Sequence, residues 1–180
     1  MKDLVRPFLL PVLAAGMLCA CGGGISLSFV DDGGGDEFFD GAFRSGRPAF
    51  ATVSAATEPR LNGSYSSSDA RLSHVFRFRA RGDAPETCRF QFEGLRQPES
   101  GAFMSGEIQY LPDSDQLRAS FIVIDGREFR VDGNNGVALD RASNSVVYNG
   151  AVLASTQGTG QAITLGGSIP MRNESRPSGC

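Results

Sequence analysis

The sequence predicts an all-β fold, an antiparallel up-and-down meander of about eight or nine strands. Apolar and polar residues alternate with a period of two over most of the second half of the 180-residue chain. Turn-forming Gly, Asn, Asp and Pro residues separate these runs at short intervals, and no run beyond the N-terminal segment has a convincing helical pattern. Because such a sheet avoids open edges, we expect a small barrel in preference to a two-sheet sandwich.

The N-terminus has the composition of a signal peptide. Lys2 and Arg6 precede an apolar core that runs from Pro7 to Met17. A membrane-spanning helix needs about 20 apolar residues, so this core is too short, and Pro11 would interrupt such a helix. We therefore expect a targeting segment in place of a transmembrane helix.

This segment closes with Leu18-Cys19-Ala20-Cys21, which resembles the lipobox of bacterial lipoproteins. The resemblance implies cleavage before Cys21 and a diacylglycerol thioether on its sulfur. With a further acyl chain on the freed amine, the lipid would anchor the protein stably in a membrane. Gly22 after the cysteine implies, by the same resemblance, delivery to the outer membrane. The alternative is an ordinary secretory signal cut after Ala20, with the bulky Leu18 where a small residue is usual.

The chain then divides into three parts. We expect a removed signal peptide at 1–20, the lipidated cysteine with a flexible tether at 21–48, and a single β domain at 49–180. The tether is rich in Gly and Asp, a composition that does not bury enough apolar surface to fold alone. Its apolar island at Ile25–Val30 and the pair Phe38-Phe39 are candidates for docking on the domain.

The expected strands follow in order along the domain. A possible first strand covers 50–53, and a long second strand covers 71–81, with Leu72, His74 and Phe76 on its buried face. Later strands are expected at 88–93, 103–111, 117–124, 127–131, 137–139, 146–152 and 163–171. Asp125-Gly126 predicts a two-residue hairpin turn, and Gly133–Gly136 predicts another turn.

The last two runs predict a long hairpin, in which Gly150, Gly166 and Gly167 permit bends or bulges. A tight turn at Asn149-Gly150, which would make two shorter strands, is the alternative.

Two cysteines remain once Cys19 leaves with the signal and Cys21 carries lipid. Cys88 and Cys180 should pair in an oxidising periplasm if their geometry allows. The alternative is that Cys88 acts as a small buried hydrophobe and Cys180 is a free thiol on a frayed tail.

The residues show no catalytic pattern. His74 is the one histidine, and we expect it on the buried face of its strand. No nucleophile motif is present, and one histidine with two distant cysteines does not make a zinc site. Asp132–Gly136 begins like a calcium loop but departs from it at Gly136 and at Ser143, so a hairpin turn explains it better. We expect no enzymatic activity, no cofactor and no bound metal.

One charge feature is a candidate for binding. Arg71, Arg77, Arg79 and Arg81 share the exposed face of the expected strand 71–81. A row of guanidinium groups suits a polyanion such as lipopolysaccharide phosphate or an acidic glycan. The alternative is a solvated outer face with carboxylate partners such as Glu93.

These features together predict a lipid-anchored protein of the cell envelope, whose β domain is a non-enzymatic binding or structural module. Over residues 1–24 the chain resembles small lipoproteins of Gram-negative bacteria that begin with Cys-Gly-Gly-Gly. The net charge of −3, or −4 without the signal peptide, argues against nucleic acid as a partner. We expect a monomer held at the membrane through Cys21. Alternatives are a carrier of a small apolar ligand inside the barrel, or a hydrolase of envelope polymers built around His74.

Overall fold

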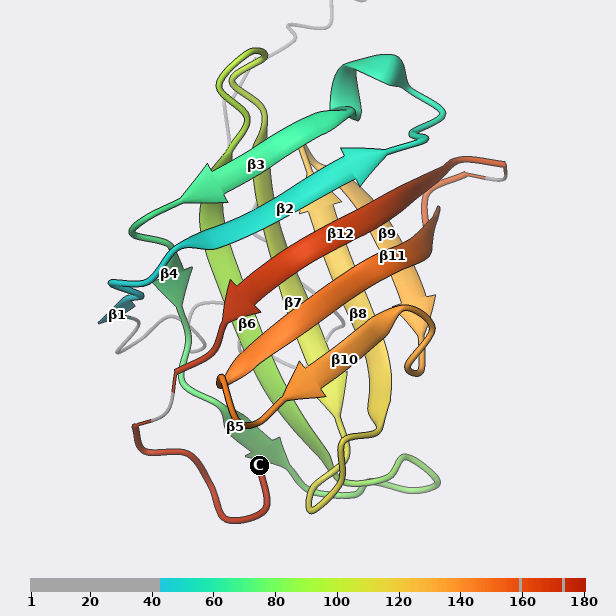
Figure 1. The fold of residues 1–180 in the computed structure, drawn as a ribbon. Helices are drawn as coiled ribbons and strands as arrows, with labels where there is room; N and C mark the ends of the chain where they lie inside the picture. Colours follow the sequence, from blue (N-terminus) through green and yellow to red (C-terminus); the bar gives the residue numbers. More distant parts are fainter. Residues whose placement is uncertain (1–42, 159, 173) are drawn as a thin grey trace, which may run out of the picture.

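The computed structural model describes residues 43–158, 160–172 and 174–180. The predicted signal peptide, Cys21 and the tether up to residue 42 lie outside the described residues. Within the described residues the protein is all-β, with one short 3-10 turn at Pro59–Leu61 (Figure 1). The predicted fold class is confirmed.

Eight antiparallel strands form a closed barrel, in which each strand pairs with a neighbour on both sides. They are β2 (Ala49–Ser54), β3 (Gly63–Ser67), β6 (Thr87–Arg96), β7 (Phe103–Tyr110), β8 (Leu117–Ile124), β9 (Arg127–Asp132), β11 (Ser145–Ser155) and β12 (Ala162–Pro170). The pairing of β12 with β2 joins the last strand to the first of the eight. The expected up-and-down barrel is therefore confirmed.

Four short strands are added to this barrel. They are β1 (Phe43–Arg44), β4 (Arg71–Leu72), β5 (Phe76–Phe78) and β10 (Val137–Asp140). β1 pairs with β4, β4 and β5 pair with β6, and β10 pairs with β11. The sheet thus begins at Phe43, within the range 21–48 that the sequence assigned to the tether.

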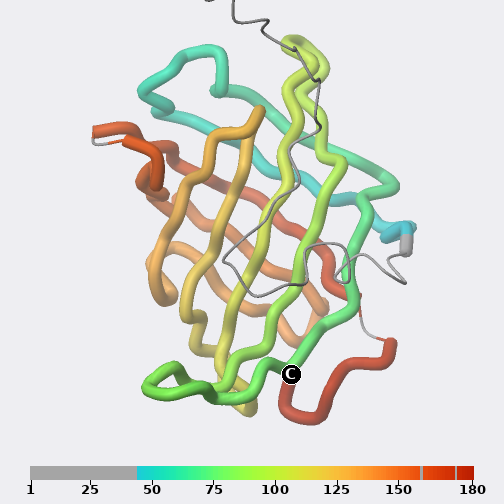
Figure 2. The backbone as a smooth tube through the Cα atoms, turned by 180° about the vertical axis from the view of Figure 1, so that it is seen from behind, coloured from blue at the N-terminus to red at the C-terminus, as the bar shows by residue number. Residues whose placement is uncertain are grey.

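The barrel is closed by two narrow seams. β3 meets β6 at one residue pair, Ser66 with Arg96, and β9 meets β11 at two, Arg130 with Ala154 and Phe129 with Ser155. Beyond these seams the strands separate into two facing layers. We call the layer of β3, β2, β12, β11 and β10 the front sheet, and the layer of β4, β5, β6, β7, β8 and β9 the back sheet. Figure 1 shows the front sheet nearest the viewer, and Figure 2 shows the back sheet.

The predicted hairpins are present. Asp125 and Gly126 both have positive φ, +48° and +77°, and connect β8 directly to β9. β11 and β12 form the long hairpin, whose pairing shifts between Tyr148 and Ala151. This shift is a bulge, so the alternative of a tight turn at Asn149-Gly150 is excluded.

The expected continuous strand over 71–81 is wrong, because the chain leaves the ladder at Ser73. The Ser73 hydroxyl accepts a hydrogen bond from the backbone N–H of Gln91 at 2.9 Å and donates to the carbonyl of His74 at 2.7 Å. A serine side chain that bonds the backbone in this way competes with regular pairing. Ser73 and Val75 are consequently buried, and His74 is only half-buried. The predicted alternation therefore fails over this segment.

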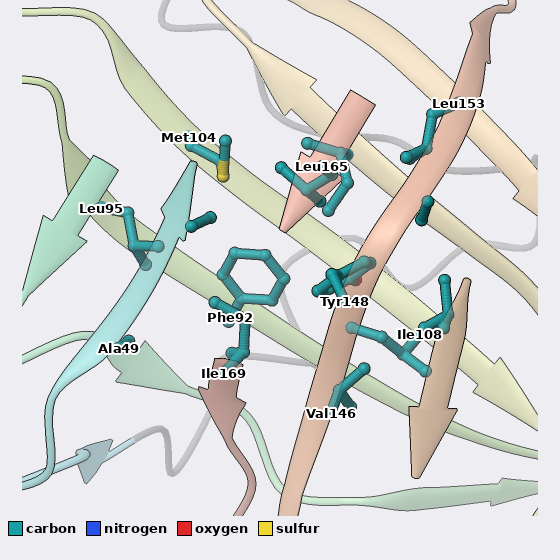
Figure 3. Packing of buried hydrophobic residues seen from close by; sticks show 14 of the residues in the cluster. Ala49, Phe92, Leu95, Met104, Ile108, Val146, Tyr148, Leu153, Leu165 and Ile169 are labelled. Atoms are coloured by element: carbon teal, nitrogen blue, oxygen red, sulfur yellow. The ribbon is translucent and has the colours of Figure 1, made fainter. Parts of the chain in front are cut away.

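Side chains from the two sheets fill the barrel interior (Figure 3). Phe92 and Met104 from the back sheet meet Leu165 and Ile169 from the front sheet within one apolar cluster. Such packing is the main source of the free energy of folding.

All three tyrosines of the chain belong to this core, and each places its hydroxyl on a partner. Tyr65 donates to the Leu61 carbonyl and Tyr110 to the Cys180 carbonyl, both at 2.9 Å, and Tyr148 lies 2.7 Å from the Ser120 hydroxyl. Burial raises the pKa of Tyr65 to about 12 and also raises the pKa values of Tyr110 and Tyr148. The phenols are therefore neutral, hydrogen-bonded parts of the core.

At Gly167 the backbone of β12 lies close to that of β2. Its φ is +136°, and a Cβ atom there would lie 2.3 Å from the Phe50 carbonyl oxygen. We predict that Gly167→Ala lowers the free energy of unfolding by about 2 kcal/mol, through backbone strain and overpacking. Gly166→Ala is the matched control, since its nearest neighbour would be 3.9 Å away. The control should stay within about 0.5 kcal/mol of the wild type in urea unfolding. Equal stability of the two variants would contradict the assigned register.

Candidate functional site

A hollow lies outside the barrel, at the seam between β3 and β6. It is a groove of about 920 Å³. Its walls come from β1, the β3–β4 connection, β4, the end of β6, the start of β7, and the β8–β9 turn. Six parts of the fold, several of them distant in the sequence, thus meet at one place, which is typical of binding sites carried on a rigid scaffold.

A bulge in β6 shapes one wall of this groove. The pairing of β6 with β7 shifts between Phe92 and Leu95, and Gly94 in this bulge has a φ of +92°. Glycine adopts this conformation readily, whereas other residues are strained in it. A bulge bends its strand and redirects the side chains that follow. Both Glu93 and Arg96 line the groove on either side of it.

The groove carries charges of both signs. Its lining includes the guanidinium groups of Arg44, Arg71 and Arg96 and the carboxylates of Asp69, Glu93 and Asp125. Arg44 lies 3.3 Å from Asp69, and Arg71 forms an ion pair with Glu93. These pairs are largely exposed, so they contribute little to stability and remain in contact with solvent.

Phe103 supplies an apolar surface in the groove. It is one of the few large hydrophobic side chains that are exposed, at 48%. The Arg96 guanidinium lies 4.3 Å from the centroid of its ring, within cation–π range. An exposed aromatic ring beside charged groups is a frequent anchor in protein interfaces.

The four arginines predicted to form a row do not lie together on one strand. Arg71 lines the groove from β4. Arg77 lies on β5, where its Nε donates to Glu86 at 2.9 Å and its Nη1 donates to the Ser178 carbonyl at 2.7 Å. Arg79 and Arg81 are exposed beyond the end of β5. The break at Ser73 separates Arg71 from the others, and polyanion binding by the four stays a prediction.

His74 is held by a cation. Arg172 Nη1 lies 3.1 Å from Nε2 of His74, and Arg172 Nε lies 3.3 Å from Glu174. A guanidinium group only donates hydrogen bonds, so Nε2 is the acceptor in this contact. Phe76 packs edge-on against the imidazole, with the centroids 6.4 Å apart. His74 thus helps to fix the C-terminal segment against the back sheet.

The residues that resemble the start of a calcium loop are used as a turn. Asn134 Oδ1 accepts from the Leu117 N–H at 3.0 Å, and the Asn135 amide donates to the Asp132 carbonyl at 2.8 Å. In the part of the chain that the structure describes, no cluster of three or more His, Cys, Asp or Glu side chains is arranged to hold a metal ion.

The described residues also contain no helix with the length and apolar character needed to cross a bilayer.

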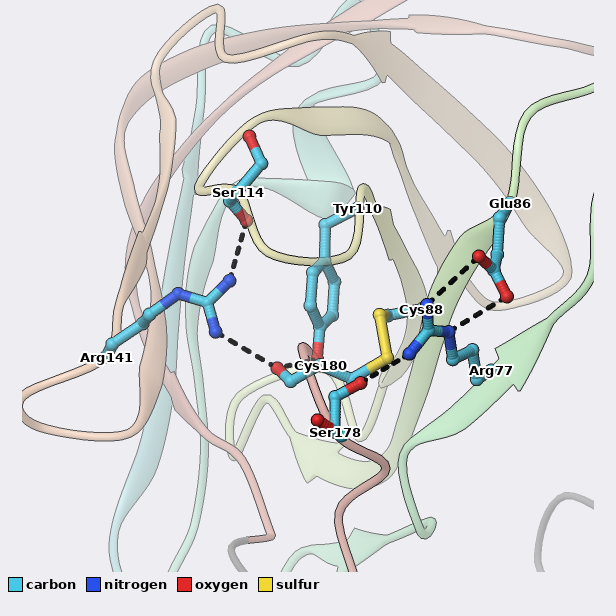
Figure 4. The surroundings of a disulfide bond; sticks show 8 residues. All are labelled: Arg77, Glu86, Cys88, Tyr110, Ser114, Arg141, Ser178 and Cys180. Atoms are coloured by element: carbon cyan, nitrogen blue, oxygen red, sulfur yellow. Dashed lines mark hydrogen bonds and ion pairs between the residues drawn. A yellow bond between two sulfur atoms is a disulfide. The ribbon is translucent and has the colours of Figure 1, made fainter.

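The predicted disulfide between Cys88 and Cys180 is confirmed, with a Cα–Cα distance of 5.7 Å (Figure 4). It joins the last residue of the chain to the buried face of β6. The Cys180 carbonyl accepts hydrogen bonds from Tyr110 at 2.9 Å and from Arg141 at 3.2 Å. Arg77 donates a hydrogen bond to the Ser178 carbonyl nearby. The hydrogen bonds from Arg77 to Glu86 lower the pKa of that carboxyl group. The tail therefore closes the end of the barrel that is opposite the groove.

Sequence patterns did not identify the groove. Of its residues, only Arg71 had been singled out as a binding candidate, and Glu93 as its possible partner. The sequence signal that was available is Gly94, which interrupts the alternation of β6 and marks the bulge.

Comparison with protein-family models, with curated proteins and with solved structures finds no match to this chain.

The disulfide closes a loop over a sequence separation of 92 residues. In the chain-entropy model a loop of this length stabilises the folded state by about 4–5 kcal/mol. We predict that Cys88→Ala with Cys180→Ala lowers the free energy of unfolding by about this amount in guanidinium titrations. Tyr110→Phe, which leaves the disulfide and removes one hydrogen bond to the tail, should cost only about 1 kcal/mol. An unchanged midpoint for the double variant would refute the stabilising role.

Proposed function

We propose that this protein is a lipid-anchored, non-catalytic binding module of the bacterial cell envelope. The groove at the β3–β6 seam is the observation that carries the binding role. The resemblance of Leu18–Cys21 to a lipobox supports the anchor, and the disulfide is compatible with an oxidising compartment.

The packing of the barrel supports binding on the outside. Large side chains such as Phe90, Phe92 and Tyr148 occupy the interior. A carrier of an apolar ligand requires interior space, which this packing disfavours. The groove at the β3–β6 seam is open to solvent, so a partner can reach it more easily than the barrel interior.

The lining of the groove supports a polypeptide as the partner. The groove is lined by three guanidinium groups, three carboxylates and the hydroxyls of Ser66, Ser67 and Ser68. A partner with basic and acidic groups along one chain would complement such a surface, because opposite charges fix register and orientation. Phe103 would anchor an apolar side chain of the partner.

A photo-crosslinking amino acid tests the groove. Placed at Phe103 in cells, it should give a defined cross-linked product. The matched control is the same group at Val152, which is also an exposed hydrophobic residue, at 62%, but lies on β11 in the front sheet. Changing Arg71 and Arg96 to Ser should reduce the Phe103 product, whereas changing Arg79 and Arg81 to Ser should leave it unchanged. Equal products at the two sites, or none at Phe103, would show that the groove is not the binding surface.

The anchor is tested separately through the N-terminal cysteines. Cys21→Ser should abolish lipidation and release the protein from the membrane fraction, because the thioether needs the Cys21 sulfur. Cys19→Ser should leave the mature protein unchanged, since Cys19 would leave with the signal peptide. Mass spectrometry of the N-terminal peptide reports both outcomes. A mature chain that starts elsewhere in wild-type cells would disprove the anchor and leave the groove proposal standing.

A further inference from the structure

The outer face of the back sheet is buried, although its side chains point away from the barrel interior. The pairing register sets these residues in rows across β6, β7 and β8. One row contains Gln91, Glu107 and Phe121, and Ala119 and Val123 lie on either side of it. Their exposures are between 1% and 9%. We call these five residues the outer wall.

The outer face of the front sheet is exposed, in contrast to the outer wall. Its outward-pointing side chains are accessible, as alternation in a half-buried strand predicts. Phe50 on β2 is 51% exposed, and Val152 on β11 is 62% exposed. Position on the outside of the barrel therefore does not explain why the outer wall is buried.

The carboxylate of the outer wall has hydrogen-bond donors within the same sheet. Glu107 accepts hydrogen bonds from Gln91 Nε2 at 2.9 Å and from Gln109 Nε2 at 2.5 Å. A buried carboxylate is costly unless neighbouring donors compensate it. On a solvated sheet face such a network has little advantage, so the arrangement suits a surface that is covered.

Cationic side chains border the outer wall. The Arg130 guanidinium lies 5.2 Å from the centroid of the Phe121 ring, and Arg89 lies 4.2 Å from that of Phe78. The Nε atom of Arg89 is buried and has no hydrogen-bond partner among the described residues. Arg130 also pairs with Asp132 at 2.6 Å, so an acidic group that reaches this edge would meet Arg89 first.

The described strands do not supply the cover. Figure 2 looks onto β6, β7 and β8, the strands that carry the outer wall, and no described strand crosses them. The described chain begins with β1, which pairs with β4, and β4 pairs with β6. The 42 preceding residues therefore join the domain at the edge of this same sheet.

We propose that the segment from Ile25 to Phe39 of this chain packs on the outer wall. Its apolar island alternates, so that Ile25, Leu27 and Phe29 share one face of an extended chain. Phe38 and Phe39 add two aromatic rings. Acidic residues Asp31, Asp32 and Asp36 lie between these apolar parts and complement the bordering arginines.

The length of the connecting chain permits this packing. Twelve residues separate Val30 from Phe43 and span up to about 40 Å when extended. The three strands of the outer wall are only about 10 Å across, because neighbouring strands lie about 4.8 Å apart. The island can thus reach every row of the wall from the position of β1.

A single tryptophan tests this packing, because the chain has no tryptophan of its own. In the purified full chain, Phe29→Trp should give a blue-shifted emission relative to the same protein in denaturant. Adding Val123→Lys on the outer wall should shift the emission to the red. Adding Val152→Lys on the front sheet, the matched control, should leave it in place. Solvent-like emission from Phe29→Trp, or an equal response to both lysines, would overturn the proposal.

Thiol labelling gives a second readout that does not place a charge on the wall. Val123→Cys should react at least about tenfold faster when residues 25–30 are deleted, a factor that corresponds to about 1.4 kcal/mol. Val152→Cys should react at the same rate in both backgrounds. Peptide mass spectrometry separates these sites from Cys21. An unchanged rate at position 123 would refute packing of the island there, whether or not Cys21 is lipidated.

Discussion

The barrel is closed by backbone pairing at one end only, and much of the remaining structure depends on this constraint. The two narrow seams lie at the end that carries the β6–β7 and β8–β9 connections. At the opposite end, β10 and β5 occupy edges that the barrel strands leave open, and the C-terminal tail lies between the two sheets. The disulfide and the carbonyl contacts of Cys180 hold that tail in place. An open sheet edge invites pairing with other chains, so these elements cover edges of the barrel as well as stabilising it.

The same seam that closes the barrel creates the candidate binding site. At the Ser66–Arg96 pair, β3 turns away toward β4, and the bulge at Gly94 turns the end of β6 outward. The groove lies between these diverging segments. Its walls are therefore fixed by main-chain pairing, whereas its charged side chains are exposed and can exchange partners. A rigid main-chain frame reduces the entropy lost on binding.

Local patterns predicted most of the fold, and long-range contacts account for what they missed. Alternation and turn residues identified strands from Cys88 to Met171 because both signals depend only on near neighbours. The Cys88–Cys180 pair could be predicted because few cysteines remained. The break at Ser73 could not, since it depends on a hydrogen bond to Gln91, 18 residues away. The prediction that His74 lies on the buried face of its strand was consequently wrong, since the residue is only half-buried. The groove was also beyond prediction, because it joins residues from Arg44 to Gly126.

The outer wall and the groove share a border, which connects the two proposals. Val123 belongs to the outer wall and also lines the groove. Its cross-strand neighbour Ser105 lines the groove too. A segment packed on the wall would thus form part of the rim that a partner meets. If Cys21 carries lipid, only Gly22–Gly24 would separate the membrane anchor from the packed island, a span of at most about 14 Å. With the island packed on the wall, the back sheet would then lie close to the bilayer, because the connecting chain is so short.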